Sequence, residues 1–275
     1  MSTEARIAKH WTRGGLAEAV RAALAAAGLD ADKLTVADLA PLDQFHGRGL
    51  EATSELARHL DLRPGQHVLD IGCGIGGPAR FIAAEYRCRV TGIDLTAEFC
   101  KVAAMLNRAT GLADMVVVKQ ASALALPFAD AAFDAAYTQN VSMNIADKRA
   151  FYAEAARVVK RGGRFVAAEY AVGPGGPPLF PVPWARVPEN SHLASVDDTR
   201  RLLEQAGFHL LALNDRTPAM LAHYEETRRR IAAEGRPILG AHILLGDDAV
   251  ERLKNSARSV EEGRTVPIEA VCRRV

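Results

Sequence analysis

A glycine-rich run constrains this chain more than any other feature. Residues 68–77 read Val-Leu-Asp-Ile-Gly-Cys-Gly-Ile-Gly-Gly, and apolar residues follow at helical spacing. The run predicts a buried strand that ends on a carboxylate and turns tightly into a helix. Glycines in the turn let the backbone adopt positive φ angles and come close to a ligand. The spacing Gly72-x-Gly74-x-x-Gly77 also satisfies the dinucleotide-binding fingerprint, so the glycines alone leave the ligand open.

Two residues beside the glycines separate the ligand classes. A pyrophosphate favours free N–H donors and positive potential at the start of a helix. Asp70 instead places a carboxylate at the tip of the strand, and Pro78 removes an N–H donor from the first helical turn. A carboxylate at this point suits a cation, such as the ammonium group of a methionyl ligand. A glycine-rich turn that binds no ligand is the alternative.

A second acidic strand end supports a nucleoside ligand. Residues 89–94 (RVTGID) predict a short strand whose last residue, Asp94, lies 24 residues after Asp70. An acid at the end of the second strand can accept both hydroxyl groups of a ribose. An ordinary acid at the N-terminus of a helix is the alternative reading of Asp94.

Composition excludes several classes of protein. The 275 residues are 49% hydrophobic and 24% charged, which is typical of a globular chain with a full core. The net charge is +1 and no basic stripe is interleaved with aromatic residues, so we expect no nucleic-acid partner. No apolar run approaches the ~20 residues needed to span a membrane. The four cysteines lack metal-ligand spacing, so we expect reduced thiols, no metal and a cytoplasmic location.

Strand and helix patterns alternate through the middle of the chain. Strands are expected at 68–71, 89–94, 115–119, 133–138, 164–170, 208–213 and 267–272, and helices at 16–27, 49–60, 147–160, 220–234 and 247–262. This alternation predicts an α/β fold with a doubly wound, mostly parallel seven-stranded sheet. We divide the chain into an N-terminal helical cover (1–62), an α/β core (63–213), a helical insertion (214–264) and a final strand (265–275).

One segment of the core breaks the alternation. Residues 172–190 hold six of the 13 prolines together with Leu179, Phe180 and Trp184. So many prolines exclude a regular helix or an interior strand. Apolar bulk on a stiff loop beside the ligand end of a sheet predicts a lid over the site, with a surface linker as the alternative.

From about Asp43 to Thr217 the chain resembles class I S-adenosylmethionine (SAM)-dependent methyltransferases. It is similar to the sarcosine/dimethylglycine N-methyltransferases and, more distantly, to the tocopherol methyltransferases. The matching segments, besides the glycine-rich run, are 43–46 (DQFH) with Gly49, Ala52 and Thr53, 92–96 (GIDLT), 126–128 (LPF), 141–145 (VSMNI), 157–163 (RVVKRGG) and 181–185 (PVPWA). The resemblance implies a Rossmann-like methyltransferase fold and SAM as cofactor, with S-adenosylhomocysteine (SAH) as product.

The resemblance also implies roles for particular residues. The predicted cofactor residues are Asp70, Gly72, Cys73, Gly74, Gly76, Asp94, Leu95, Ser122, Ala123 and Gln139. The predicted substrate residues are Gln44, Asn144, Phe180 and Trp184, and the candidate catalytic residues are His46, Tyr137 and Asn140. We expect a small-molecule acceptor with an amine or hydroxyl group, and a homodimer is compatible with the chain.

Two departures from the family pattern bear on activity. The family usually has Gly-Asp-Ala before the Leu-Pro-Phe segment, whereas this chain has Ala121-Ser122-Ala123. A hydroxyl accepts a hydrogen bond from adenine without charge assistance, so the bond is weaker. Relatives often have Gln-His where this chain has Gln139-Asn140, and Asn cannot act as a general base. A SAM- or SAH-binding protein with little or no catalysis is therefore the alternative function, and a nicotinamide-linked oxidoreductase is a more distant one.

Overall fold

A single mixed sheet forms the centre of the molecule. The computed structural model describes residues 2–275. The strands are β1 (His67–Ile71), β2 (Arg89–Asp94), β3 (Val116–Gln120), β4 (Phe133–Gln139), β5 (Val159–Val172), β6 (Phe208–Asp215) and β7 (Thr265–Arg274). Their order is β3-β2-β1-β4-β5-β7-β6; the pairs from β3 to β5 are parallel, and β7 runs antiparallel to both neighbours. The predicted mostly parallel, seven-stranded α/β sheet is confirmed.

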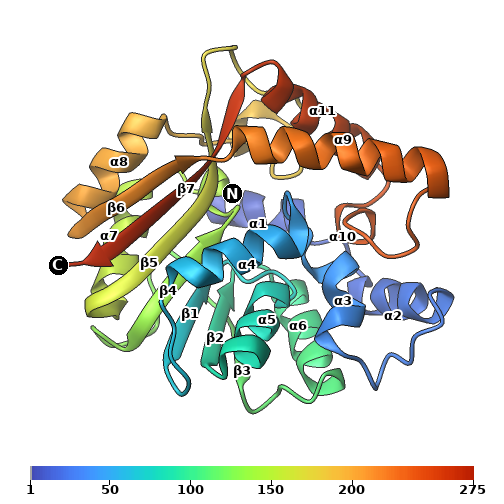
Figure 1. The fold of residues 1–275 in the computed structure, drawn as a ribbon, viewed down its shortest axis with the longest axis horizontal. Coiled ribbons are helices and arrows are strands. Elements are labelled where there is room, and N and C mark those ends of the chain that lie inside the picture. Colours follow the sequence, from blue (N-terminus) through green and yellow to red (C-terminus); the bar gives the residue numbers. More distant parts are fainter. Residues whose placement is uncertain (1) are drawn as a thin grey trace.

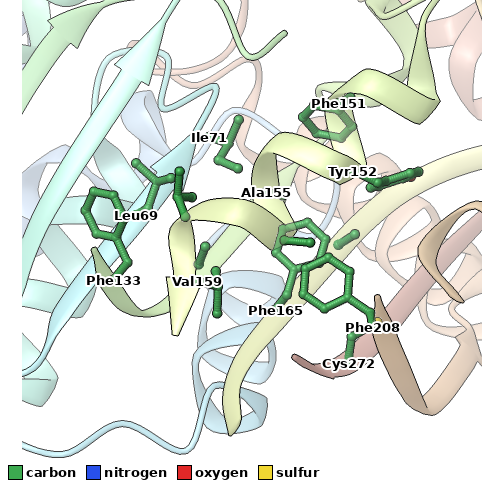
Figure 2. Close-up of a cluster of buried hydrophobic side chains, with 14 of the residues drawn as sticks. Leu69, Ile71, Phe133, Phe151, Tyr152, Ala155, Val159, Phe165, Phe208 and Cys272 are labelled. Carbon is green, nitrogen blue, oxygen red and sulfur yellow. The ribbon is translucent and has the colours of Figure 1, made fainter. Parts of the chain in front are cut away.

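Helices cover both faces of the sheet. On one face, α4 (Gly49–His59) and α5 (Gly77–Tyr86) pack through Leu56 and Ile82 against strand residues such as Val68. On the other face lie α7 (Lys148–Val158) and α8 (Val196–Gln205). Figure 2 shows this second layer, where Phe151 and Tyr152 lie near Phe165 in one buried cluster. The helix α6 (Ala97–Ala109) lies beside β2 and β3.

Three helices precede the core. They are α1 (Thr3–Trp11), α2 (Leu16–Ala26) and α3 (Val36–Asp43). Apolar residues of α2 and α3, including Val20 and Leu39, share a buried cluster with Val102 of α6. The sequence analysis expected only the middle one of these helices. The N-terminal segment therefore packs against the core through its own apolar residues.

A second group of helices lies between β6 and β7. These helices are α9 (Thr217–Glu234), α10 (His242–Leu245) and α11 (Ala249–Glu261), within the segment expected to be an insertion. In Figure 1, α9 extends to the right beyond the strands, above the N-terminal helices α2 and α3, with α10 between them. No helix among residues 2–275 is long and apolar enough to cross a membrane.

One predicted boundary is wrong. The sequence analysis continued a helix to residue 160, but α7 ends at Val158 and β5 begins at Val159. Val159 already pairs with Phe133 of β4, so the chain is extended before the glycines at 162 and 163. The segment 172–190 is irregular as expected, with a short 3-10 turn, η2 (Pro188–Asn190), at its end.

Candidate active site

The turn after β1 is packed so closely that only glycine fits. Gly72 has a φ of +81°, and an added Cβ there would lie 2.3 Å from a methyl carbon of Val141. At Gly77 an added Cβ would lie 2.3 Å from the carbonyl oxygen of Asp43, at the end of α3. The backbone of the glycine-rich run thus packs closely against two segments, the segment after β4 and the N-terminal helices.

Asp70 lies buried near the end of β1, opposite Tyr137 of β4. The Tyr137 hydroxyl donates a hydrogen bond of 2.7 Å to Asp70 Oδ2. Burial raises the pKa of Asp70 to about 7, the Tyr137 hydrogen bond lowers it, and the nearby charge of Asp94 raises it further. The site therefore holds a carboxyl group whose ionisation a bound cation would favour.

Asp94 ends the neighbouring strand β2. Its Oδ2 accepts a hydrogen bond of 2.9 Å from the Gly74 N–H, and its Oδ1 accepts one of 2.8 Å from the Thr96 N–H. Desolvation raises the pKa of this carboxyl group, and the two backbone hydrogen bonds oppose the shift. These bonds tie the acid to the glycine turn, so both carboxylates occupy the same end of the parallel strands, where such sheets bind ligands.

A cavity of about 1990 Å³ opens at this end of the sheet. Most of the predicted site residues line it, namely Gln44, His46, Asp70, Gly72, Cys73, Gly74, Asp94, Leu95, Ala123, Gln139, Asn140, Asn144 and Trp184. The cavity is larger than the 300–1,000 Å³ typical of small-molecule sites, so it has room for two ligands side by side.

Four predicted site residues lie outside the lining of this cavity. Gly76 is the N-cap of α5, and Tyr137 is fully buried with its hydroxyl on Asp70. The Ser122 hydroxyl donates to a carboxylate oxygen of Glu4 in α1 and accepts a hydrogen bond from Leu124 N–H. Phe180 packs against the buried cluster that contains Trp184 and is not among the residues that line the cavity. Tyr137 and Phe180 are therefore not among the residues that line the cavity, and the roles that the sequence analysis gave them stay predictions.

His46 belongs to a polar network on the floor of the cavity. Its Nδ1 lies 3.2 Å from Gln139 Nε2 and 3.3 Å from the Gly47 carbonyl oxygen. Its Nε2 lies 3.2 Å from Gln44 Oε1 and 3.1 Å from Thr53 Oγ1. Burial lowers the pKa of His46 to about 4, so the ring is neutral at physiological pH. Both ring nitrogens have protein partners, which favours a positioning role.

Asn144 and Trp184 hold the surrounding loops together. Asn144 accepts a hydrogen bond from the Trp11 indole N–H and donates to the carbonyl oxygens of Trp184 and Asn190. Trp184 is 2% exposed and stacks on Tyr170 at a centroid distance of 5.2 Å. Both residues therefore line the cavity, but most of their polar atoms already form hydrogen bonds within the protein.

Sequence reasoning missed Glu169, which fixes the turn after β4. Its Oε2 accepts hydrogen bonds of 3.0 Å from the N–H groups of Val141 and Ser142, and its Oε1 accepts one from Thr138. Asn140, with a φ of +60°, lies in this turn. An acid near the end of a predicted strand (164–170) was the available signal, since buried carboxylates need partners.

Sequence reasoning predicted an N-terminal cover and a helical insertion but did not identify the residues with which they line the cavity. Thr3, Glu4, Ile7 and Trp11 of α1 line it, as do residues from 223 to 258 in and around α9–α11. No sequence pattern shows that these distant helices meet at the strand ends. Among residues 2–275, no group of three or more His, Cys, Asp or Glu side chains is arranged to hold a metal ion.

Comparisons with known proteins agree with this arrangement. Residues 69–167 match the model of a family described as a methyltransferase domain. The chain is 34% identical over 173 residues to a phosphoethanolamine N-methyltransferase of Triticum aestivum, covering 63% of this chain and 34% of that protein. It is 27% identical over 221 residues to a sarcosine/dimethylglycine N-methyltransferase of Halorhodospira halochloris, covering 79% of this chain and 76% of that protein.

Solved structures share the fold over the whole chain. The geranyl diphosphate C-methyltransferase of Streptomyces coelicolor A3(2) has a TM-score of 0.73 and 20% identity, covering 100% of this chain and 99% of that one. At this identity the likeness establishes the fold alone. The chain spans about a third of the length of the phosphoethanolamine N-methyltransferases it matches. The resemblance to class I methyltransferases noted from the sequence is confirmed.

Proposed function

We propose that this chain, which carries a methyltransferase domain over residues 69–167, is a SAM-dependent methyltransferase acting on a small molecule with an amine or hydroxyl group. One observation carries the proposal. Two carboxylates, Asp70 and Asp94, flank a glycine turn at adjoining strand ends and open into one large cavity. Relatives named for phosphoethanolamine and for sarcosine and dimethylglycine support an amine as the acceptor.

The residues on the cofactor side fit SAM. Asp70 would hold the ammonium group, because a buried carboxyl group with a pKa near 7 gains a proton or a cation readily. Asp94 would accept the ribose hydroxyls, with the Gly74 N–H already fixing its orientation. Ala123 and its neighbours would contact the adenine, whereas the Ser122 hydroxyl is bound to Glu4. When bound, SAM supplies an activated methyl group on a sulfonium.

On the acceptor side, the protein would position the acceptor and exclude water. The network of Gln44, His46, Thr53 and Gln139 presents fixed polar atoms to the cavity, and the Gln44 Nε2 atom is buried without a partner among the described residues. That amide N–H therefore has no hydrogen-bond acceptor among the described residues. Holding two reactants in line contributes a large part of the rate in such a transfer. No strong base is needed unless the acceptor is protonated at the working pH.

A protein that binds SAM or SAH with little catalysis is the second candidate. Ser122 in place of an acid and Asn140 in place of a histidine favour it. A nicotinamide-linked oxidoreductase is disfavoured, because Asp70 lies where a pyrophosphate would need positive potential. We also propose a cytoplasmic location, which the four free cysteines support, and a homodimer stays a prediction.

Calorimetric titration with SAM, SAH and NAD tests the cofactor. We expect SAM and SAH to bind and NAD not to bind. Asp94→Ala should bind SAM roughly tenfold or more weakly, because it loses charge-assisted hydrogen bonds of ~1.5–3 kcal/mol. Asp114→Ala, at an exposed acid outside the cavity, is the matched control and should bind as the parent does. Unchanged affinity in Asp94→Ala would contradict the assignment.

A further inference from the structure

The helices between β6 and β7 present their charges unevenly. Residues 217–264 contain eight basic and eight acidic side chains, so the segment is neutral as a whole. Five of the basic residues line the cavity, namely Arg228, Arg230, Arg236, Lys254 and Arg258, whereas only two of the acidic ones do, Glu234 and Asp247. A neutral segment therefore presents a surplus of positive charge to the site.

Three of these five cations carry no ion pair. Arg228 pairs with Glu261, and Arg258 pairs with Glu262 at 2.9 Å. By contrast, Arg230, Arg236 and Lys254 form no salt bridge with any of the residues from 2 to 275. Their charges are available to a ligand in the cavity.

The positive potential extends inward from these helices. His223 of α9 also lines the cavity, and its pKa is lowered by burial first and then by the charges of Arg230 and Arg48. Arg48 is neutralised by salt bridges to Glu51 and Glu55, whereas Arg230 is not. The positive charge of Arg230 therefore acts on His223, a half-buried residue of the cavity lining.

The two ends of the cavity have opposite charge. Asp70 and Asp94 lie at the strand ends, whereas the unpaired cations lie on α9, on α11 and in the loop between α9 and α10. The acidic end suits the cationic cofactor proposed above, so the basic end is left for the second ligand. Apolar side chains of the same segment between β6 and β7, namely Leu239, Ile243 and Leu253, also line the cavity.

We propose that the methyl acceptor is an anionic amphiphile whose phosphate or carboxylate group is held by Arg230, Arg236 and Lys254. This inference rests on the proposed function, because it assigns the acidic end of the cavity to SAM. The apolar side chains of the same wall accommodate the body of the acceptor. The amine or hydroxyl that receives the methyl group then points toward the network around His46.

Binding of matched amphiphiles tests this proposal. Octyl phosphate, nonanoate and octyltrimethylammonium share an octyl chain and differ in head group, and each is titrated calorimetrically in the presence of SAH below its micelle concentration. We expect at least one anion to bind ten times more tightly than the cation. The tighter anion identifies the head group as phosphate or carboxylate. Its affinity should fall as salt rises, because the contact is electrostatic.

A pair of double variants locates the anion. Arg230→Gln with Lys254→Gln should weaken anion binding at least tenfold and leave SAM binding unchanged. The control, Arg229→Gln with Lys101→Gln, removes the same net charge at residues outside the cavity lining and should have no effect.

Equal affinity for all three probes, or an equal loss in the control, would overturn the proposal. Loss of SAM binding in the first double variant would also overturn it, since the cations would then serve the cofactor. Failure of the parent protein to bind SAM, with the anion results intact, would count against the proposed function alone.

Discussion

At the scale of single residues, the carboxyl group of Asp70 has unusual surroundings. Its one side-chain donor is the neutral hydroxyl of Tyr137, and no cation from the described chain pairs with it. Burial of such a group favours its protonated form, and a bound ammonium group would favour the ionised form. The ligand-free pKa of about 7 therefore makes cofactor affinity depend on pH.

We predict that the affinity for SAM falls roughly tenfold between pH 8 and pH 6. Below its pKa of about 7, Asp70 is protonated, and the cation must displace that proton before it binds. Asp70→Asn keeps an acceptor for the Tyr137 hydroxyl but cannot ionise, so its affinity should be weaker and independent of pH. Calorimetry in two buffers of different ionisation enthalpy measures the released proton. A parent protein with equal affinity at both pH values would contradict this role.

His46 should act by positioning. Both of its ring nitrogens have protein partners, and burial keeps it neutral with a pKa of about 4. Once an acceptor is known, His46→Gln should mainly raise the KM for the acceptor, with kcat changed less than about tenfold. Turnover is measured from pH 6 to pH 9 in His46→Gln and His46→Ala. A hundredfold drop in kcat in both variants, with loss of the alkaline rise in rate, would identify His46 as the general base instead.

At the scale of elements, a buried ion pair joins the N-terminal helices to the core. Arg80 of α5 is fully buried and donates to Asp43 of α3 at 2.9 Å, to the Ile75 carbonyl at 2.7 Å and to Asn107 of α6 at 2.8 Å. The same end of α3 contacts the glycine turn at Gly77. Loss of this pair would therefore loosen both the N-terminal helices and the turn.

We predict that Arg80→Met lowers the free energy of unfolding by about 3–5 kcal/mol, because it leaves the Asp43 carboxylate buried without its partner. Adding Asp43→Asn should recover part of the loss. Arg108→Met, at an exposed position of α6, should change stability by less than about 0.5 kcal/mol. Urea denaturation measures all three variants. A loss under about 1 kcal/mol in Arg80→Met would show that the pair contributes little.

The elements that the sequence predicted well are those with a strong local pattern. The strands β1 and β2 are short apolar runs that end on acids, so both carboxylates could be placed from sequence alone. The helix α3 contains Pro41, which argues against a helix, and α1 buries only Ile7. The partner of Asp70 could not be predicted, because it depends on the register between β1 and β4.

At the scale of the whole molecule, three parts of the chain that are distant in sequence enclose one cavity. The α1–α3 region, the strand ends and the α9–α11 region each contribute to its lining. The sequence analysis predicted an N-terminal cover at residues 1–62 and a lid at residues 172–190, and within the predicted lid Pro183 and Trp184 line the cavity. Arg252 of α11 holds that segment by donating to the carbonyl oxygens of Val182 and Pro183. The loop is thus attached to the helices that form most of the acceptor wall.

Transfer of a labelled methyl group tests the central claim most directly. The protein is incubated with methyl-labelled SAM and a panel of amines and alcohols, with and without phosphate or carboxylate groups, and SAH and labelled product are quantified together. We predict equimolar SAH and methylated product with at least one acceptor, and a rate at least tenfold lower in Asp94→Ala at subsaturating SAM. A protein that binds SAM tightly but forms no SAH above the acceptor-free level with any acceptor would contradict the assignment as an enzyme.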